Sequence, residues 1–498
     1  MSIKSSLAKV YAFIVKKKIN HWSSRPHQTQ QKVFKNLLTK GTHTVFGKDH
    51  QFDKITTYEE FVNRVPVRDY EGLRSYVDRV VAGEKNILWP GKPLYFAKTS
   101  GTTSGAKYIP ITAESMPTHI AAAKNAILCY IAETGNTDFV NGKMIFLQGS
   151  PVLEEKNGIK IGRLSGIVAH FVPSYLQTNR MPSWNTNLIE DWEQKVDAIV
   201  EETFQENMQV ISGIPPWVQM YFEKLTQKTG KKISELFPGF SLFIYGGVNY
   251  EPYRASFEKL IGRSIPSIEL YPASEGFFAF QDSQTEKGML LQLDSGIFYE
   301  FIRSDTFFDK NPKRILLDEV EKGVNYVMII STTAGLWGYN IGDTISFVST
   351  APYRVIVTGR IKHFISAFGE HVIGKEVEES LRIATYNTHI RVNEFTVAPQ
   401  VNPKEGLPYH EWFIEFDEEP QNMEQFIQSL DQALQNQNTY YKDLVQGKVL
   451  SPLRISKVKK KGFQDYMRSI GKLGGQNKTP RLSDNRKIAD ALQLFTIL

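Results

Sequence analysis

Residues 96–110 (FAKTSGTTSGAKYIP) concentrate groups that bind phosphate. Gly101 and Gly105 let the backbone turn and approach a ligand closely. Lys107, at the end of the stretch, supplies a point charge suited to a β or γ phosphate. Hydroxyl donors stand beside the main-chain amides; they belong to Thr99, Ser100, Thr102, Thr103 and Ser104.

The stretch differs from the phosphate loop of P-loop NTPases. Ala106 stands where the second glycine of that motif is required, and no Lys-Ser or Lys-Thr pair follows. We therefore expect a phosphate-binding loop of another kind. A polar surface turn is the alternative.

Two adjacent glycines, Gly246 and Gly247, follow an apolar run that indicates a buried strand. A segment with helical spacing begins at about Pro252. Glycines at the carboxyl end of a strand can admit a flat ring such as adenine against the backbone. A structural turn is the alternative.

A third and a fourth stretch carry carboxylates. After the apolar run at 267–270 come Tyr271, which could stack on a base, and then Ser274 and Glu275. A carboxylate beside a triphosphate is a natural Mg²⁺ ligand, because this cation prefers oxygen and keeps most of its waters. Asp343, at the expected start of another strand, could accept hydrogen bonds from both ribose hydroxyls. For both acids, a solvated turn residue is the alternative.

Short apolar runs alternate with helical periodicities from Tyr95 onward, which predicts α/β layers. The segment TTYEEFVNRVP predicts a helix that begins at a Thr N-cap, and Thr112 is the expected N-cap of the helix after the phosphate loop. The sequence changes character near Gly359, where a strand pattern gives way to a charged turn and a new helix. We expect a large N-terminal domain at 1–358 with β-sheets and surrounding helices, a hinge at 359–365, and a mobile, small α+β C-terminal cap at 366–498.

Composition excludes several classes of protein. The chain has 498 residues and a net charge of +6, without a basic face interleaved with aromatics, so we expect no nucleic-acid partner. The single Cys129 rules out an internal disulfide, and the ten His residues lack zinc-binding spacing, which favours a reducing cytoplasmic location. Residues 7–18 indicate an amphipathic first helix, and no run approaches the roughly 20 apolar residues of a membrane span.

Together, and in this order, the motifs resemble those of the adenylate-forming superfamily, which includes acyl-CoA synthetases and firefly luciferase. Within it the chain is most similar to the Gretchen-Hagen family of acyl acid amido synthetases, over nearly its whole length. The segments TVFGKDHQFDKITTYEEFVNRVPVRDYEGL and GEKNILWPGKPLYFAKTSGTTSGAKYIPIT, and GGQNKTPR near the end, carry this closer resemblance.

The resemblance implies ATP and Mg²⁺ as cofactors, and a small carboxylic acid and an amino acid as substrates. It assigns Tyr339 and Arg360 to the nucleotide site as well, and Glu275 to the metal. Lys107 and Lys478 become the catalytic cations, and Lys478 follows Gly474 and Gly475 on a segment able to close over the α-phosphate. The hinge implies that the cap reorients between adenylation and amide formation.

The sequence departs from the family pattern in places. Pro272 and Ala273 replace residues common in the third motif, and Asn340 stands where an arginine is frequent. The helix after the phosphate loop has small residues where benzoate-using relatives carry an arginine, so plant substrates cannot be transferred.

Neither substrate can be named from the sequence. Residues 213–217 (GIPPW) and the segment after Gly166 are candidates for the acyl pocket, and Glu370 and His371 for the base that serves the amine. Two alternatives stay open: a ligase with a thiol acceptor, and a non-catalytic nucleotide-binding protein.

Overall fold

The structure is a computed structural model that describes most of the chain. The described residues are 3–102, 105–171, 179–247, 250–304, 306–361, 364–365, 367–370, 372–386, 388, 390–470, 479 and 481–497. Within these ranges the description is limited to the backbone at 100–102, 105, 193, 216, 251–253, 255, 359–360, 364–365 and 373–375.

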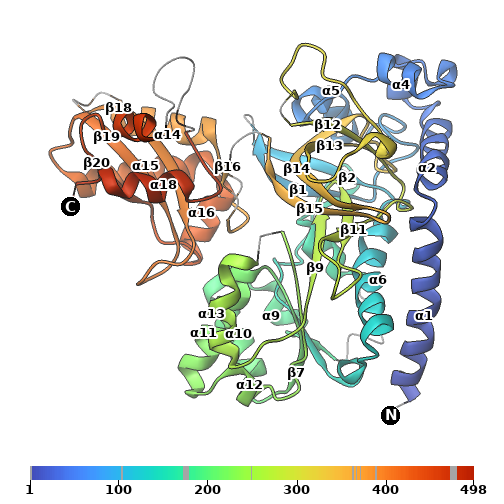
Figure 1. Cartoon of the computed structure of the whole chain (residues 1–498), viewed down its shortest axis with the longest axis horizontal. Coiled ribbons are helices and arrows are strands. Elements are labelled where there is room, and N and C mark those ends of the chain that lie inside the picture. The colour runs from blue at the N-terminus through green and yellow to red at the C-terminus, as the bar shows by residue number, and fades with distance from the viewer. Residues whose placement is uncertain are drawn as a thin grey trace.

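The chain forms two lobes, a large N-terminal lobe and a smaller C-terminal lobe coloured orange to red in Figure 1. This is the mixed α/β architecture with a separate α+β cap that the sequence predicts. The last strand of the large lobe ends at Arg360, inside the predicted hinge. The domain boundaries themselves stay a prediction.

An 11-stranded sheet forms the centre of the large lobe within the described ranges. One half is parallel, because helices cross over between its strands, and the other half is an antiparallel meander. From one edge to the other, the strands are β12 (Ile297–Arg303), β13 (Asn325–Thr332), β14 (Tyr339–Thr350), β15 (Tyr353–Arg360), β11 (Met289–Leu291), β10 (Gly276–Phe280), β9 (Ser267–Ala273), β8 (Leu242–Gly246), β7 (Met208–Ser212), β3 (Lys143–Phe146) and β6 (Arg180–Met181).

A second, four-stranded sheet carries the predicted phosphate loop. Its strands are β2 (Gly105–Ile111), β1 (Tyr95–Thr102), β5 (Ile159–Gly162) and β4 (Glu154–Lys156), in that order. The loop is the tip of the β1–β2 hairpin.

Helices cover the sheets on both sides. The helices before the first hairpin are α1 (Ile3–Ser23), α2 (Pro26–Gly41), α3 (Val45–Asp49), α4 (Tyr58–Arg64) and α5 (Tyr70–Val81). Those after it are α6 (Met116–Thr134), α7 (Leu164–Ala169), α9 (Trp184–Leu188), α10 (Trp192–Thr203), α11 (Pro215–Thr229), α12 (Ile233–Leu236) and α13 (Glu251–Ile261). α6 packs against β9 and β10, and α1 packs along the outside of α6 (Figure 1).

The small lobe has its own sheet and core. Two short strands, β16 (Phe364–Ile365) and β17 (Val372–Ile373), lead into it. Its sheet consists of β18 (Arg391–Gln400), β19 (Tyr409–Glu418) and β20 (Arg454–Val458), and its helices are α14 (Gly374–Thr385), α15 (Met423–Gln437), α16 (Thr439–Gln446), α17 (Gly462–Ser469) and α18 (Lys487–Leu492). A buried cluster around Trp412, Leu430 and Tyr441 joins α14, α15 and α16 to β18 and β19, and a second cluster around Phe413 holds α17 and α18.

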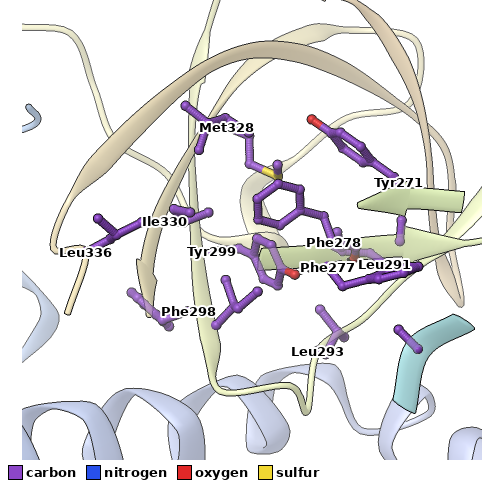
Figure 2. Close-up of a cluster of buried hydrophobic side chains, with 14 of the residues drawn as sticks. Tyr271, Phe277, Phe278, Leu291, Leu293, Phe298, Tyr299, Met328, Ile330 and Leu336 are labelled. Carbon is purple, nitrogen blue, oxygen red and sulfur yellow. Dashed lines mark hydrogen bonds between the residues drawn. The ribbon is translucent and has the colours of Figure 1, made fainter. Parts of the chain in front are cut away.

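Large apolar side chains fill the interior of the main sheet around β9, β10 and β12 to β14. Figure 2 shows Phe277, Phe278, Tyr299 and Met328 packed together, with Tyr271 at one end of the cluster. The predicted site residues on β9 and β14 therefore stand on a rigid, close-packed base.

Local signals in the sequence set most of the helix ends. The predicted N-cap Thr57 of α4 forms a capping box with Glu60. The predicted N-cap Thr112 of α6 is wrong: the helix begins at Met116, and Thr112 closes the preceding turn by accepting a hydrogen bond from the Ser115 amide. Pro117 occupies the first turn, where a proline needs no hydrogen-bond partner for its nitrogen.

The predicted first helix is present as α1, and apolar side chains lie on its exposed face as well as on its buried face. Among the helices that the structure describes, none is long and apolar enough to cross a membrane.

Candidate active site

A hydrogen bond joins the third and fourth sequence motifs. The Tyr271 hydroxyl donates to Oδ2 of Asp343 over 2.6 Å, and both side chains are nearly buried, with 7% and 8% exposed. The Tyr271 ring packs edge-on against Phe278, with 5.1 Å between ring centres. Stacking on a base, as predicted for Tyr271, is therefore restricted to the small accessible part of the ring. The contact that the structure shows is the one that orients Asp343.

The backbone before Asp343 is bent so that this carboxylate sits at an irregular point of the sheet. Gly342 has φ +87°, and its amide donates to Oδ1 of Asn340 over 2.8 Å. Asn340, which replaces a common arginine of the family, thus stabilises the bend. Asp343 lies in the middle of β14 rather than at its start, and its register partner on β15 is Arg360, whose side chain is not among those described.

Ser274 and Glu275 form the turn between β9 and β10. Ala273 and Gly276 are paired on either side of them, so the two side chains project from the end of the hairpin. Both residues are half-buried. The two residues lie three and four positions beyond Tyr271, and their side-chain oxygens are partly accessible to solvent.

The two predicted adenine-site glycines are required for different reasons. A Cβ on Gly246 would lie 2.4 Å from the Leu270 carbonyl oxygen on β9, so glycine here lets the two strands pack. Gly247 has φ +78°, and no atom of the described residues lies within 4 Å of the position of an added Cβ. Only glycine readily adopts this backbone conformation, and the space beside it is open. A flat ring could therefore lie against the backbone here.

The β1–β2 hairpin places Thr99 directly opposite Lys107. The Lys107 ammonium lies 5.8 Å from the centre of the Tyr70 ring, and the Tyr70 hydroxyl accepts a 2.9 Å hydrogen bond from the Tyr108 amide. Burial raises the pKa of Tyr70, so it stays a neutral partner. Only the backbone is described for Ser100, Gly101, Thr102 and Gly105, and Thr103 and Ser104 lie outside the described residues.

One short segment holds this hairpin next to β14. The Arg68 amide donates to the Gly338 carbonyl, and the Asn340 amide donates to the Arg68 carbonyl. Tyr70, two residues on, supports Lys107. The phosphate hairpin and the strand that carries Asp343 are therefore anchored to the same three residues.

Four other residues predicted from the sequence have different outcomes. Tyr339 is 1% exposed, so only its backbone could reach a nucleotide in this arrangement. Glu370 is fully buried: it accepts a 2.7 Å hydrogen bond from the Phe368 amide and lies 2.8 Å from Nε2 of His410, which leaves it unsuited to act as a base at the site. Lys478 and His371 lie outside the described residues.

The two lobes meet at the hairpin that carries the phosphate loop. The Tyr440 hydroxyl on α16 donates to the Lys98 carbonyl over 3.0 Å, and Arg163 pairs with Asp443 at 2.7 Å. The Arg163 guanidinium also lies 5.0 Å from the centre of the Tyr440 ring. These contacts cross directly from α16 to β1 and to the residue before α7.

A cavity of about 810 Å³ opens between the lobes beside these contacts. Its large-lobe wall includes Thr99 and Ala106 of the hairpin and the start of α10, and its small-lobe wall includes Glu376 and Asn438. A ligand in this cavity would therefore lie next to the phosphate hairpin.

Lys195 is a buried cation in the wall of this cavity, and sequence reasoning missed it. It is 2% exposed, and its ammonium donates to the Asn187 carbonyl over 2.8 Å, its only partner among the described residues. Burial, and secondarily the charge of Arg163, lowers the pKa of Lys195 to about 8. Such a shift indicates an ammonium that lacks an anionic partner.

Two indoles line the cavity near Lys195. Trp192 and Trp217 pack with 4.3 Å between ring centres, and neither Nε1 has a hydrogen-bond partner within the described ranges. Trp217 ends the GIPPW stretch that we expected to contribute to a substrate pocket. Nothing in the sequence singled out Trp192 or Lys195, because an amphipathic helix accounts for both residue types.

Comparison with solved structures shows which fold the chain has. The chain aligns with the acyl acid amido synthetase AtGH3.15 in complex with 2,4-DB, at TM-score 0.62 and 17% identity, over 98% of this chain and 97% of that one. It also aligns with a 2-hydroxyisobutyryl-CoA ligase in the thioester-forming state, at TM-score 0.56 and 13% identity, over 94% of this chain and 91% of that one. The fold is that of adenylate-forming ligases.

Sequence comparisons identify the family. Three family models match: the GH3 family N-terminal domain at 15–187, central domain at 290–360 and C-terminal domain at 375–487. An indole-3-acetic acid-amido synthetase of Arabidopsis thaliana, GH3.15, is 22% identical over 94% of this chain and 92% of its own length. A jasmonoyl-L-amino acid synthetase of Nicotiana attenuata, JAR4, is 21% identical over 64% and 66%. The chain belongs to the GH3 family of acyl acid amido synthetases and is an ATP-using ligase of that family.

Proposed function

We propose that this ligase activates a carboxylic acid as its acyl adenylate at the Tyr271–Asp343 site and then transfers the acyl group to an amino acid held in the interlobe cavity. The observation that carries the proposal is the direct hydrogen bond between Tyr271 and Asp343, which unites two motifs distant in the sequence. A carboxylate fixed in this way offers two acceptors to the ribose hydroxyls.

In the first step, an oxygen of the acid attacks the α-phosphorus of ATP and pyrophosphate leaves. The hairpin amides, the hydroxyls between Thr99 and Ser104 and the Lys107 ammonium bind the departing phosphates. Asp343 holds the ribose, and the open backbone at Gly247 faces the adenine. Arg360, whose backbone pairs with Asp343, and Lys478 complete the positive charge around the phosphates. Positioning and charge supply most of the rate enhancement.

Magnesium fits this site as an ion that arrives with the nucleotide. The described residues contain no group of three or more His, Cys, Asp or Glu side chains that could hold a metal. Magnesium is commonly bound by one or two carboxylates together with substrate phosphates, and Glu275 at the β9–β10 turn is the carboxylate that would contribute. When bound, the ion would neutralise part of the charge on pyrophosphate.

In the second step, the amine nitrogen of the acceptor attacks the acyl carbon and AMP leaves. Lys195 is suited to bind the acceptor's carboxylate, because a buried ammonium gains most from an anionic partner. Trp192 and Trp217 offer apolar surface and two N–H donors beside it. We therefore propose an amino acid with an apolar or aromatic side chain. The acid, the assignment of these site residues and a cytoplasmic location all stay predictions.

The test is acid-dependent exchange of labelled pyrophosphate into ATP across a panel of carboxylic acids. The expected result is exchange with one class of acid. Asp343→Ala should need more ATP to reach the same exchange rate, and the exposed-carboxylate control Asp318→Ala should behave like the wild type. Mass spectrometry of the products then separates an amide from a CoA thioester. A protein that binds ATP without exchange for any acid would overturn the proposal and favour a non-catalytic nucleotide-binding role.

A further inference from the structure

The first helix, α1, has an apolar stripe on the face that points away from the protein. Ile3, Leu7, Val10 and Ile14 are 82%, 63%, 61% and 57% exposed. Their spacing of four, three and four residues places them on one line along the helix. The buried face lies on the opposite side and is marked by Ser5, Ala12 and Ile19 at intervals of seven.

The stripe is wider than these four residues. Phe13 and Tyr11 flank it on either side and are also exposed. Scattered apolar residues are common on protein surfaces, but a continuous apolar row on a helix already packed by its other face indicates a surface that binds something. Packing within the large lobe therefore does not account for the apolar side chains of this row.

The lysines of α1 are not balanced by any acidic residue of the helix itself, and one carboxylate from another segment, that of Asp294, lies close enough to interact with Lys18. Ten of the 59 Lys and Arg residues and none of the 53 Asp and Glu residues lie before Asp49, so the chain after that point is net acidic. Lys4, Lys9, Lys17 and Lys18 make no ion pair with any described residue. Lys16 points inward, where it bonds Asp282 at 3.1 Å and fixes the helix to the large lobe.

We propose that the outer face of α1 docks on an anionic lipid bilayer, with the helix lying in the plane of the interface. The stripe would enter the boundary between headgroups and acyl chains, and the flanking lysines would reach the phosphates. An exposed apolar row combined with basic residues and no acidic ones has the two attractions that such binding requires.

A second copy of the chain fits this surface less well. Two antiparallel α1 helices packed stripe to stripe would bring Lys4 and Lys9 of each copy close to Lys17 and Lys18 of the other. Two parallel helices would bring each lysine close to the same lysine of the other copy. α1 contains no carboxylate that could compensate for this repulsion. An anionic surface is complementary to the whole helix.

The position of α1 makes docking compatible with catalysis. The helix runs along the outside of α6, at the edge of the molecule opposite the small lobe (Figure 1). A bilayer at this edge would leave the interlobe cavity and the small lobe unobstructed. The inference is independent of which acid and amine the enzyme joins.

The experiment measures binding of the full chain to large unilamellar vesicles by co-sedimentation at about 0.15 M salt, where weak surface attraction is screened. Vesicles of equal parts phosphatidylglycerol and phosphatidylcholine are compared with phosphatidylcholine alone. We expect binding to the anionic vesicles and at least tenfold weaker binding to the neutral ones.

Two pairs of substitutions separate the two attractions. Leu7→Gln with Ile14→Gln is expected to weaken partitioning at least tenfold, because two apolar side chains no longer leave water. Lys17→Gln with Lys18→Gln is expected to weaken binding to anionic vesicles about tenfold or more. The matched controls are Leu494→Gln, at an even more exposed apolar residue of the small lobe, and Lys459→Gln with Lys460→Gln in the basic cluster of that lobe. Both controls should bind like the wild type.

Pyrophosphate exchange without vesicles should be unchanged in all variants, which verifies that they fold. The proposal is overturned if the wild type does not bind anionic vesicles. It is also overturned if the Leu7→Gln, Ile14→Gln variant binds them as tightly as the wild type does. A third outcome would also overturn the proposal and assign the surface to a second copy of the chain. In that outcome, light scattering shows the wild type as a dimer and this variant as a monomer, and neither binds vesicles.

Discussion

The Tyr271 hydroxyl and the Asp343 carboxylate lie 2.6 Å apart on two strands of the main sheet, and the residues are separated by 72 positions in the chain. The hydroxyl occupies one acceptor site of Oδ2 and fixes the rotamer of the aspartate. A carboxylate held in place loses less entropy when it binds a ribose. Tyr271 is thus a positioning residue for Asp343.

Tyr271→Phe should raise the KM for ATP about fivefold and leave kcat nearly unchanged. The lost hydrogen bond is worth about 1 kcal/mol and acts equally in the ground state and the transition state. Asp343→Ala should raise the same KM further. Steady-state kinetics with saturating acid measure both. Tyr326→Phe is the control, because this buried tyrosine accepts a hydrogen bond from the Glu321 amide instead. A collapsed kcat with unchanged KM would contradict the assignment.

Lys478→Ala should slow adenylation by about 10²–10³, the usual loss for one preorganised donor. Amide formation from supplied acyl adenylate should be largely spared, because the small lobe then presents a different face to the site. Single-turnover measurements of each half-reaction test this. An equal loss in both steps would refute a role confined to the first.

Lys195→Met should raise the KM for the amino acid about tenfold or more, since it removes a charged hydrogen bond to the acceptor's carboxylate. Adenylation should change less than twofold. In the wild type this KM should also rise above about pH 8, where Lys195 loses its proton. Lys228→Met, on the solvent side of the neighbouring helix, serves as the control. Impaired pyrophosphate exchange with an unchanged KM for the amino acid would place Lys195 in the first step instead.

His119 should make the large lobe sensitive to acid. Burial lowers the pKa of His119 to about 4, and its Nδ1 has no partner in the described part of the chain. In the unfolded chain, His119 takes up a proton as the pH falls below its ordinary pKa of about 6.5. In the folded chain, the same histidine stays neutral until the pH falls to about 4. The free energy of unfolding should fall through this window as the pH drops.

The contribution of His119 between pH 7 and pH 5 is about 2 kcal/mol. His119→Met should abolish that part of the loss, measured as the shift in the urea midpoint of the large lobe at the two pH values. His43→Gln, an exposed histidine, should leave the acid sensitivity as it is in the wild type. Identical losses in wild type and His119→Met would show that His119 is not desolvated in the folded chain.

Most elements of the fold could be predicted, because the signals that set them are local. The capping box at Thr57 and Glu60, the glycine after β8 and the alternation of apolar runs depend on neighbours in the chain. The predicted N-cap of α6 was three residues early, because Thr112 and Ser115 are both good caps and the turn between them is settled by a tertiary bond from Thr112 to the Thr333 carbonyl.

The site was less predictable, because its chemistry arises from contacts between distant segments. The sequence could name Tyr271 and Asp343 separately, but it could not show that the tyrosine ring would be buried and its hydroxyl committed to the aspartate. Lys195 has no motif around it. Its importance follows from burial beside a cavity whose walls come from both lobes, and only the folded chain contains that information.

The hydrogen bond from Tyr440 to the Lys98 carbonyl has a mechanical consequence. Lys98 lies in the strand that leads directly into the hydroxyl-rich tip, so any rotation of the small lobe must either break this bond or pull on β1. In the proposed mechanism, phosphates bound at this hairpin would hold β1 in place, and the loss of pyrophosphate would free β1 to move with the small lobe. The bond would then couple the departure of the first product to the reorientation of the small lobe.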